Sequence, residues 1–109
     1  MPLKKSAASK RTSLPRAADY ARSFVKDWER LSHSGRYNLN QLKEAMILLV
    51  ANDLPLGPEW LDHSLTGDWV GHRECHIGGN FLLIYKLDDT AKVGQVVFVR
   101  AGTHADLFE

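Results

Sequence analysis

The chain has 109 residues, of which 44% are hydrophobic and 25% charged, and its formal net charge is +1. This length gives room for one domain with its own core. The single cysteine, Cys75, excludes an internal disulfide framework and indicates a reducing compartment, so we expect a cytoplasmic protein. No apolar run is long enough to span a bilayer, and none follows the basic N-terminus as in a secretory signal, so we expect no membrane contact.

The charge is distributed unevenly along the chain. Residues 1–16 hold five basic and no acidic residues, whereas residues 17–109 hold nine basic and thirteen acidic ones. We expect residues 1–16 to be a basic, flexible tail, or alternatively an arm that touches RNA or a protein partner. Because the body is acidic, it lacks the broad basic field of a general nucleic-acid binder.

Two helices are expected in the first half of the body. In residues 17–32, Tyr20, Phe24, Trp28 and Leu31 recur at helical spacing, and the segment ends at Ser34-Gly35. A second helix is expected over residues 39–51, capped by Asn38 or Asn40 and followed by terminators at residues 52–53 and a loop at residues 54–58.

The second half of the chain alternates in the manner of strands. We expect strands over residues 69–77, 81–87 and 96–101, with residues 78–80 forming a hairpin loop. Thr103, three residues before Asp106, predicts a capping box and one final helical turn. The sequence therefore predicts an α+β domain over residues 17–109, with two N-terminal helices packed on one face of an antiparallel sheet.

Three of the five histidines are expected where elements meet. His63 precedes the sheet, His76 ends the first expected strand, and His104 opens the final turn. Arg100 lies four residues before His104 at the end of the last strand, and Phe108 follows it by one helical turn. Loops and strand ends on a rigid scaffold are common places for functional sites.

These residue types suit the cleavage of RNA. The ribose 2′-hydroxyl can attack its own phosphate, so a protein needs only a base, an acid and a cation. Histidine can act as base and as acid near neutral pH, and arginine matches the phosphate. An aromatic ring can stack on an exposed base.

Each candidate also has a structural interpretation. His33 and His72 are expected to be surface or structural residues, and Cys75 to be a buried small hydrophobe. Arg100 could instead pair with Glu74 across the sheet, and Phe108 could pack in the core. A zinc site is not expected, because His72 and His76 would lie about 13 Å apart along a strand.

Four segments together resemble the YafQ branch of the RelE/ParE toxin superfamily. They are residues 63–69 (HSLTGDW), 73–77 (RECHI), 82–85 (LLIY) and 100–108 (RAGTHADLF). The resemblance extends from about Tyr20 to the end of the chain and leaves the basic tail unmatched.

The resemblance implies a RelE-like fold and the toxin of a type II toxin–antitoxin system that cuts messenger RNA on the ribosome. By position, His63, His76 and His104 would handle protons, Arg100 would hold the phosphate and Phe108 would position the base. No metal or other cofactor is implied. The implied partners are a cognate antitoxin, the ribosome with its mRNA, and operator DNA only through the antitoxin complex. A ribosome that presents the strand would explain how an acidic body handles RNA.

Two positions depart from the family pattern. The family usually has Asp-Trp after the hairpin glycines, where this chain has Asn80 and Phe81. Asparagine keeps hydrogen-bonding capacity without the charge, and phenylalanine keeps a stacking face without the indole donor. We expect both to lie at the substrate, with Asn80 near His76.

Two other functions remain open at this point. The chain could be a catalytically weak member that acts mainly as a binding module in an antitoxin-bound repressor complex. It could also resemble the gyrase-directed ParE members of the superfamily, although these have no need of the set His63, His76 and His104.

Overall fold

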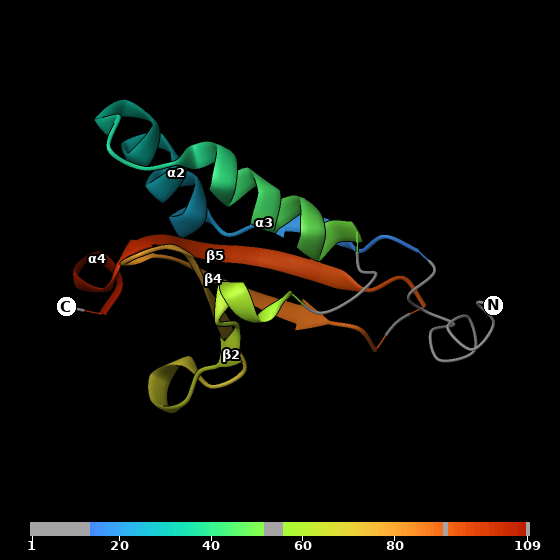
Figure 1. Ribbon diagram of the computed structural model, residues 1–109. Coiled ribbons are helices and arrows are strands. Elements are labelled where there is room, and N and C mark those ends of the chain that lie inside the picture. The colour runs from blue at the N-terminus through green and yellow to red at the C-terminus, as the bar shows by residue number, and fades with distance from the viewer. Residues whose placement is uncertain (1–13, 52–55, 91, 109) are drawn as a thin grey trace.

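The structure, a computed structural model, describes residues 14–51, 56–90 and 92–108. Most of the expected tail lies outside the described residues, as do residues 52–55 of the expected terminators and loop. In chain order the elements are β1 (Ala17–Tyr20), α2 (Arg22–Ser34), α3 (Leu39–Ala51), the 3-10 turn η1 (Pro58–Trp60), β2 (His63–Ser64), the 3-10 turn η2 (Gly67–Trp69), β3 (Arg73–Gly78), β4 (Phe81–Asp88), β5 (Gln95–Thr103) and α4 (His104–Phe108) (Figure 1).

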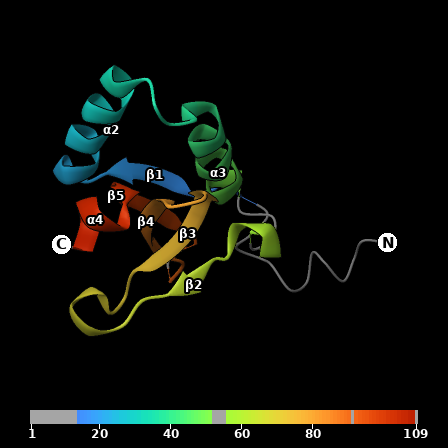
Figure 2. The same ribbon diagram turned by 60° about the vertical axis from the view of Figure 1, so that its left-hand side comes forward.

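The sheet has five strands in the order β1-β5-β4-β3-β2. The strands β2 to β5 pair antiparallel, as expected, whereas β1 runs parallel to β5. The α+β class is confirmed, and the expected three-stranded antiparallel sheet is extended by one strand at each edge into a mixed sheet. Helices α2 and α3 lie together on one side of it (Figures 1 and 2).

The first expected helix begins later than its spacing predicted. Residues 17–20 form β1, which pairs with β5 from Ala17↔Gln95 to Tyr20↔Phe98, and α2 starts at Arg22. Tyr20 still lies against Phe24, with ring centroids 5.8 Å apart, so its helical spacing reflects a real contact made from a strand. Helix α2 ends as predicted at Gly35, whose φ of 69° is easily reached by glycine.

The main core lies between the two helices and the sheet. Its buried side chains include Phe24 and Leu31 of α2, Leu42 of α3, and Tyr85 and Phe98 of the central strands. Cys75 is also fully buried there, as predicted, and burial raises the pKa of its thiol. Among the described residues, no helix combines the length and apolar composition needed to cross a membrane.

A second and smaller group of side chains is buried on the opposite face of the sheet. Leu82, Ile84 and Leu107 are buried there, with Trp69 and Val99 partly buried beside them. Helix α4 closes one end of this face, and its predicted capping box is present. The Thr103 amide donates to Asp106 over 3.0 Å, and the Asp106 amide donates to the Thr103 hydroxyl over 3.2 Å.

Strand β3 is shorter than the expected strand 69–77. The residues Gly67–Trp69 form η2, and Gly71 has a φ of 92°, so the extended chain begins only at Arg73. The hairpin that follows turns at Gly79, with a φ of 54°, after a bulge between His76 and Gly78. This bulge turns the end of β3 at the place where the candidate histidines meet.

Arg16 is fixed to the body although it was expected to end the flexible tail. Its guanidinium makes two hydrogen bonds of 3.0 Å to the carboxylate of Asp89 and one of 2.7 Å to the Leu49 carbonyl. The ordered body therefore includes Arg16, just before β1.

Candidate active site

Three histidines from three elements lie side by side on the face of the sheet opposite the helices α2 and α3, and we call them the histidine row. The ring of His63 on β2 lies 6.2 Å from that of His76 on β3, and His76 lies 6.3 Å from His104 at the start of α4. In the sheet His63 is paired with Glu74, and side chains of paired residues share a face. The structure thus brings together the three histidines that were singled out in the sequence.

A buried carboxylate lies between two of these imidazoles. Glu74 is only 3% exposed, and its Oε2 lies 3.4 Å from His63 Nε2 and 3.5 Å from His76 Nε2. Glu74 was considered in the sequence only as a partner of Arg100, a pairing that the structure contradicts. A carboxylate at this distance attracts an imidazole that carries a proton on the nitrogen facing it.

The ring orientations of His63 and His104 are set by oxygen acceptors. His63 Nδ1 lies 2.8 Å from the Leu61 carbonyl, so it carries the proton and Nε2 faces Glu74. His104 Nδ1 lies 2.8 Å from the Asn80 Oδ1, which also accepts from the His104 amide over 3.4 Å. Asn80 was expected beside His76, and its hydrogen bonds instead join it to His104.

One aromatic residue, Phe108, lies at the end of the histidine row that is formed by His104. The ring of Phe108 lies 5.6 Å from that of His104, and its residue is 39% exposed. Trp69 supports it edge-on at 5.9 Å, a role that the sequence did not reveal. Phe81, also expected at the substrate, is buried in the main core against Tyr37, with ring centroids 4.9 Å apart. Of the two aromatic residues expected at the substrate, Phe108 lies beside the histidines and Phe81 does not.

Arg100 is held by Asp27 of α2, a residue that no sequence pattern singled out. Its Nε and Nη2 donate to the carboxylate of Asp27 over 2.7 and 3.2 Å, and this hydrogen bonding raises the pKa of Arg100. The buried Asp27 also accepts from the Ala101 amide over 3.0 Å. Arg30 contacts both Asp27 and Asp106, so the group connects Arg100 to the helix that carries His104.

Among the described residues, no cluster of three or more His, Cys, Asp or Glu side chains has an arrangement that could hold a metal ion. The titratable groups that the structure brings together in this row are the three imidazoles and the carboxylate of Glu74.

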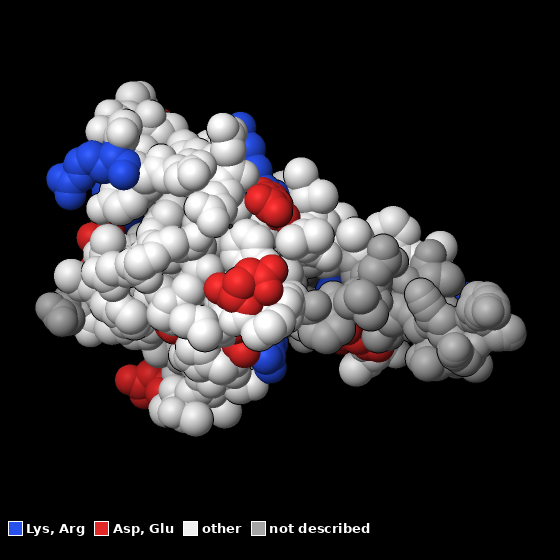
Figure 3. Space-filling view, viewed as in Figure 1, with Lys and Arg blue, Asp and Glu red and all other residues white. Residues whose placement is uncertain are grey.

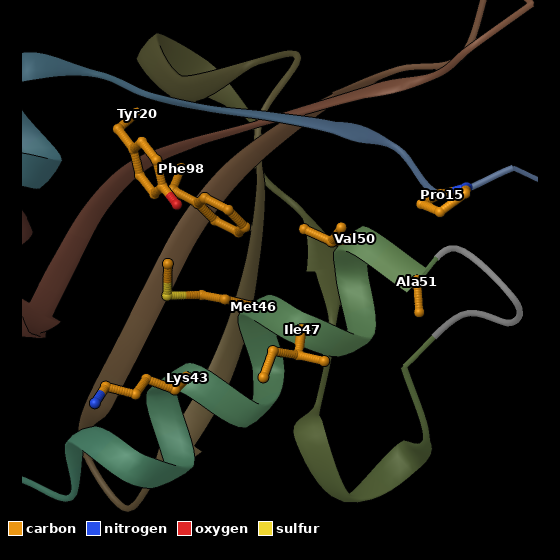
Figure 4. Close-up of a pocket in the computed structure, with 8 residues that line it drawn as sticks. All are labelled: Pro15, Tyr20, Lys43, Met46, Ile47, Val50, Ala51 and Phe98. Carbon is orange, nitrogen blue, oxygen red and sulfur yellow. The ribbon is translucent and has the colours of Figure 1, made fainter.

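An apolar groove lies on the side of the sheet that carries the helices. One part of it has a volume of about 480 Å³ and lies between α3 and β1, with Tyr20, Met46, Ile47 and Phe98 in its walls (Figure 4). A second part shares Tyr20 and Met46 and continues along α2. The exposed side chains of Tyr20 and Ile47 leave this groove open to solvent.

The surface charge agrees with the acidic composition of the body. On the described part of the face seen in Figure 3, lysine and arginine side chains form separate small groups, with acidic residues between them. That face offers no continuous basic band for a nucleic-acid backbone.

Comparison with known proteins identifies the family and the fold. Residues 16–109 match the model of the family described as "Bacterial toxin of type II toxin-antitoxin system, YafQ". The "mRNA interferase toxin YafQ" of Escherichia coli K12 is 39% identical over 95 residues, which cover 87% of this chain and 98% of that protein.

Two solved structures show the same fold. The E. coli DinJ–YafQ toxin–antitoxin complex matches with a TM-score of 0.75 and 38% identity, over 88% of this chain and 100% of the matched one. A metal-bound toxin from Helicobacter pylori matches with a TM-score of 0.73 and 30% identity, over 85% and 99%.

The α+β fold and these matches define a toxin of a type II toxin–antitoxin system. Within that class, the chain belongs to the YafQ family, as its four sequence segments indicated.

Proposed function

We propose that this chain is an endoribonuclease that cuts messenger RNA on the ribosome and thereby inhibits translation. The observation that carries the proposal is the row His63, His76 and His104, with Glu74 and Asn80 hydrogen-bonded or charge-paired to its members. The name of the E. coli relative, an mRNA interferase, supports the same class of substrate.

The reaction needs no nucleophile from the protein. A base removes the proton of the ribose 2′-hydroxyl, and the 2′-oxygen attacks the adjacent phosphorus. The bond from phosphorus to the 5′-oxygen breaks, and an acid protonates that leaving oxygen. The products are a 2′,3′-cyclic phosphate and a 5′-hydroxyl, and each proton transfer contributes about 10²- to 10⁴-fold in rate.

We assign the base to His104. Asn80 Oδ1 accepts from the His104 amide and from its ring Nδ1, so Asn80 keeps the ring proton on Nδ1. The Nε2 lone pair is then available for the 2′-hydroxyl proton.

The acid comes from the pair His63 and His76. Glu74 lies within 3.5 Å of Nε2 in both rings, so a carboxylate stands beside each of them. Two imidazoles with opposite surroundings, one beside an amide and one beside a carboxylate, suit the base and acid roles respectively.

Arg100 and Phe108 bind the substrate in this proposal. Asp27 engages Nε and Nη2 of Arg100, which leaves Nη1 to donate to a phosphate oxygen. Phe108 presents its exposed ring next to His104, where a base turned out of its stack can lie against it. Phe81 is left out of the proposal because it is buried in the core.

The partners follow from the charge and the apolar groove. An acidic body has little affinity of its own for RNA, which supports cleavage on the ribosome. The antitoxin occupies the apolar groove of α3, β1 and α2, since this is an open apolar surface away from the histidines and a relative was solved with its antitoxin. Operator DNA is bound through that complex.

The chemistry of the cut ends tests the mechanism. We expect a 2′,3′-cyclic or 3′-phosphate and a 5′-hydroxyl, with full activity in EDTA, because histidines supply both proton transfers. The EDTA arm matters because a related toxin was solved with a metal. A 3′-hydroxyl product, or activity that is lost in EDTA and restored by a divalent ion, would rule the mechanism out.

A further inference from the structure

The strand that carries His63 is too short to fix the orientation of the His63 ring. Strand β2 has two residues at the edge of the sheet, paired as His63↔Glu74 and Ser64↔Arg73. The His63 side chain is half exposed, so the ladder alone leaves its ring free to turn. Something outside the ladder must hold an imidazole in one orientation if it is to act as an acid.

A group of four side chains, which we term the Arg73 clamp, holds both neighbours of His63. Arg73 donates from Nε and Nη2 to the Asp62 carboxylate over 3.3 and 3.2 Å, and from Nη1 to the Ser64 hydroxyl over 2.8 Å. The hydroxyl of Tyr85 donates to Asp62 as well. The residue before His63 and the residue after it are thereby fixed to one guanidinium.

The clamp lies on the side of the sheet that faces the main core, and not in the histidine row. Tyr85 is fully buried in the main core, and burial together with its bond to Asp62 raises the pKa of the phenol. Tyr85 therefore stays a neutral donor over the whole physiological range. Asp62 is accordingly anchored to the rigid centre of the domain, one residue away from His63.

The backbone before the clamp has an unusual shape that the clamp helps to maintain. Leu61 has a φ of 49°, in the left-handed region that a leucine rarely adopts, and its side chain is exposed. This conformation directs the Leu61 carbonyl to His63 Nδ1 at 2.8 Å. Strained backbone of this kind persists only where its surroundings hold it in place.

We propose that the Arg73 clamp is the positioning device of His63, which keeps its proton on Nδ1 and its Nε2 directed at Glu74. Asp62, Ser64 and Tyr85 touch neither the substrate nor the reacting atoms and act only through His63. The role in cleavage rests on the proposed function, whereas the control of the His63 ring does not.

The ring itself is therefore tested first, by nitrogen NMR of the imidazoles in the full-length chain. We expect Nδ1 of His63 to be fully protonated in the native chain and to have a lower proton occupancy in Asp62→Asn, which breaks the fork with Arg73. Tyr85→Phe, which removes one hydroxyl from the core, should lower this occupancy as well. An unchanged proton occupancy of His63 Nδ1 in both variants would overturn the proposal.

A matched control separates this effect from loss of stability. Asp89 forms a second two-bond fork, with Arg16, at 3.0 Å for both bonds. Asp89→Asn removes the same chemistry away from the histidines, so it should lower the melting temperature and leave the His63 signals unchanged. If Asp89→Asn alters His63 as much as Asp62→Asn does, the effect is general destabilisation and the proposal is wrong.

A second experiment measures the rate of RNA cleavage. In single turnover, Asp62→Asn should slow cutting about 10- to 100-fold, as a misplaced catalytic group does, and should add no loss in a His63→Ala background. If Asp62→Asn slows cutting equally in the native chain and in His63→Ala, Asp62 does not act through His63 and the proposal is wrong. If the native chain does not cut translated RNA at all, the proposed function fails, and the NMR result still decides the role of the clamp.

Discussion

At the scale of the residue, the three histidines differ in what their ring nitrogens face. His104 faces an amide oxygen, whereas His63 and His76 share a carboxylate. This difference leads us to assign the base to one side of the row and the acid to the other. Substitutions at His104 and at its partner test the assignment separately.

Replacement of His104 by alanine should abolish toxicity in cells and slow cleavage about 10²- to 10⁴-fold, because a proton transfer is lost. The exposed His104 contributes little to stability, so the circular dichroism spectrum should be unchanged. His33→Ala is the matched control, since His33 is an exposed histidine on α2 that contacts only its own helix, at the Glu29 carbonyl. A fully toxic His104→Ala, or one that has unfolded, would contradict this assignment.

Replacement of Asn80 by aspartate should alter the pH profile of cleavage. A carboxylate on His104 Nδ1 stabilises the protonated ring, so a base must lose its proton at higher pH. The acid side of the profile should therefore move to higher pH, and the rate at high pH should rise. Single-turnover rates across a pH series measure this. A shift of the alkaline side would make His104 the acid, and superimposable profiles would leave Asn80 as a turn residue.

The sequence predicted which histidines lie together better than it predicted their neighbours. The histidines at 63, 76 and 104 could be selected because they stand at element junctions. Asp27 could not, since it lies 73 positions from Arg100 and looks like any surface charge of a helix. Phe81 was assigned to the substrate by position alone, and the burial of its ring against Tyr37 depends on a contact across the fold.

At the scale of the element, α4 depends on its capping box. The backbone amide of Thr103 donates to Asp106 and lowers the pKa of that carboxyl from its usual value of about 4. The folded pKa is the lower one, so the contribution of Asp106 to stability is complete above the unfolded pKa. It is lost as the pH falls through the folded pKa.

Asp106→Asn should therefore reduce the free energy of unfolding at neutral pH, and the difference from the native chain should shrink below about pH 4. Thr103→Ala, which removes the other half of the box, should cost about 1 kcal/mol. Urea unfolding at several pH values measures both. Glu44→Gln on the exposed face of α3 serves as the control, and a pH-independent difference for Asp106→Asn would contradict this account.

The two edge strands, β1 and β2, could not be predicted from sequence patterns. Residues 17–20 carry a helical spacing at Tyr20, and only pairing with β5, some 78 residues later, makes them a strand. Strand β2 has two residues, too few for any alternation to be seen. The second helix, the central strands and the final capped turn depend on local signals, and these were predicted correctly.

At the scale of the whole molecule, the apolar groove and the histidine row lie on opposite sides of the sheet. The helices and the groove occupy one side (Figures 1 and 4). Cys75 and Ile77 of β3 face the core on that side, so His76 between them faces the other side. Antitoxin binding and RNA cleavage should therefore respond to different substitutions.

Ile47→Glu should weaken the binding of the cognate antitoxin by at least tenfold and leave cleavage unchanged, because Ile47 is exposed in the groove and away from the histidines. Val93→Glu, at an exposed valine between β4 and β5, should change neither property. Calorimetric titration with the antitoxin measures the affinity. If Ile47→Glu and the native chain bind the antitoxin with equal affinity, the antitoxin binds to another surface.

The central claim is that this row of histidines cuts messenger RNA only when the ribosome presents it. The most direct measurement compares one transcript, naked and in a translating extract at physiological salt, with the cut ends mapped for the native chain and for His104→Ala. The account predicts cuts within the translated region, made by the native chain only, with naked RNA left intact. Efficient cutting of naked RNA, or equal cutting by His104→Ala, would contradict it.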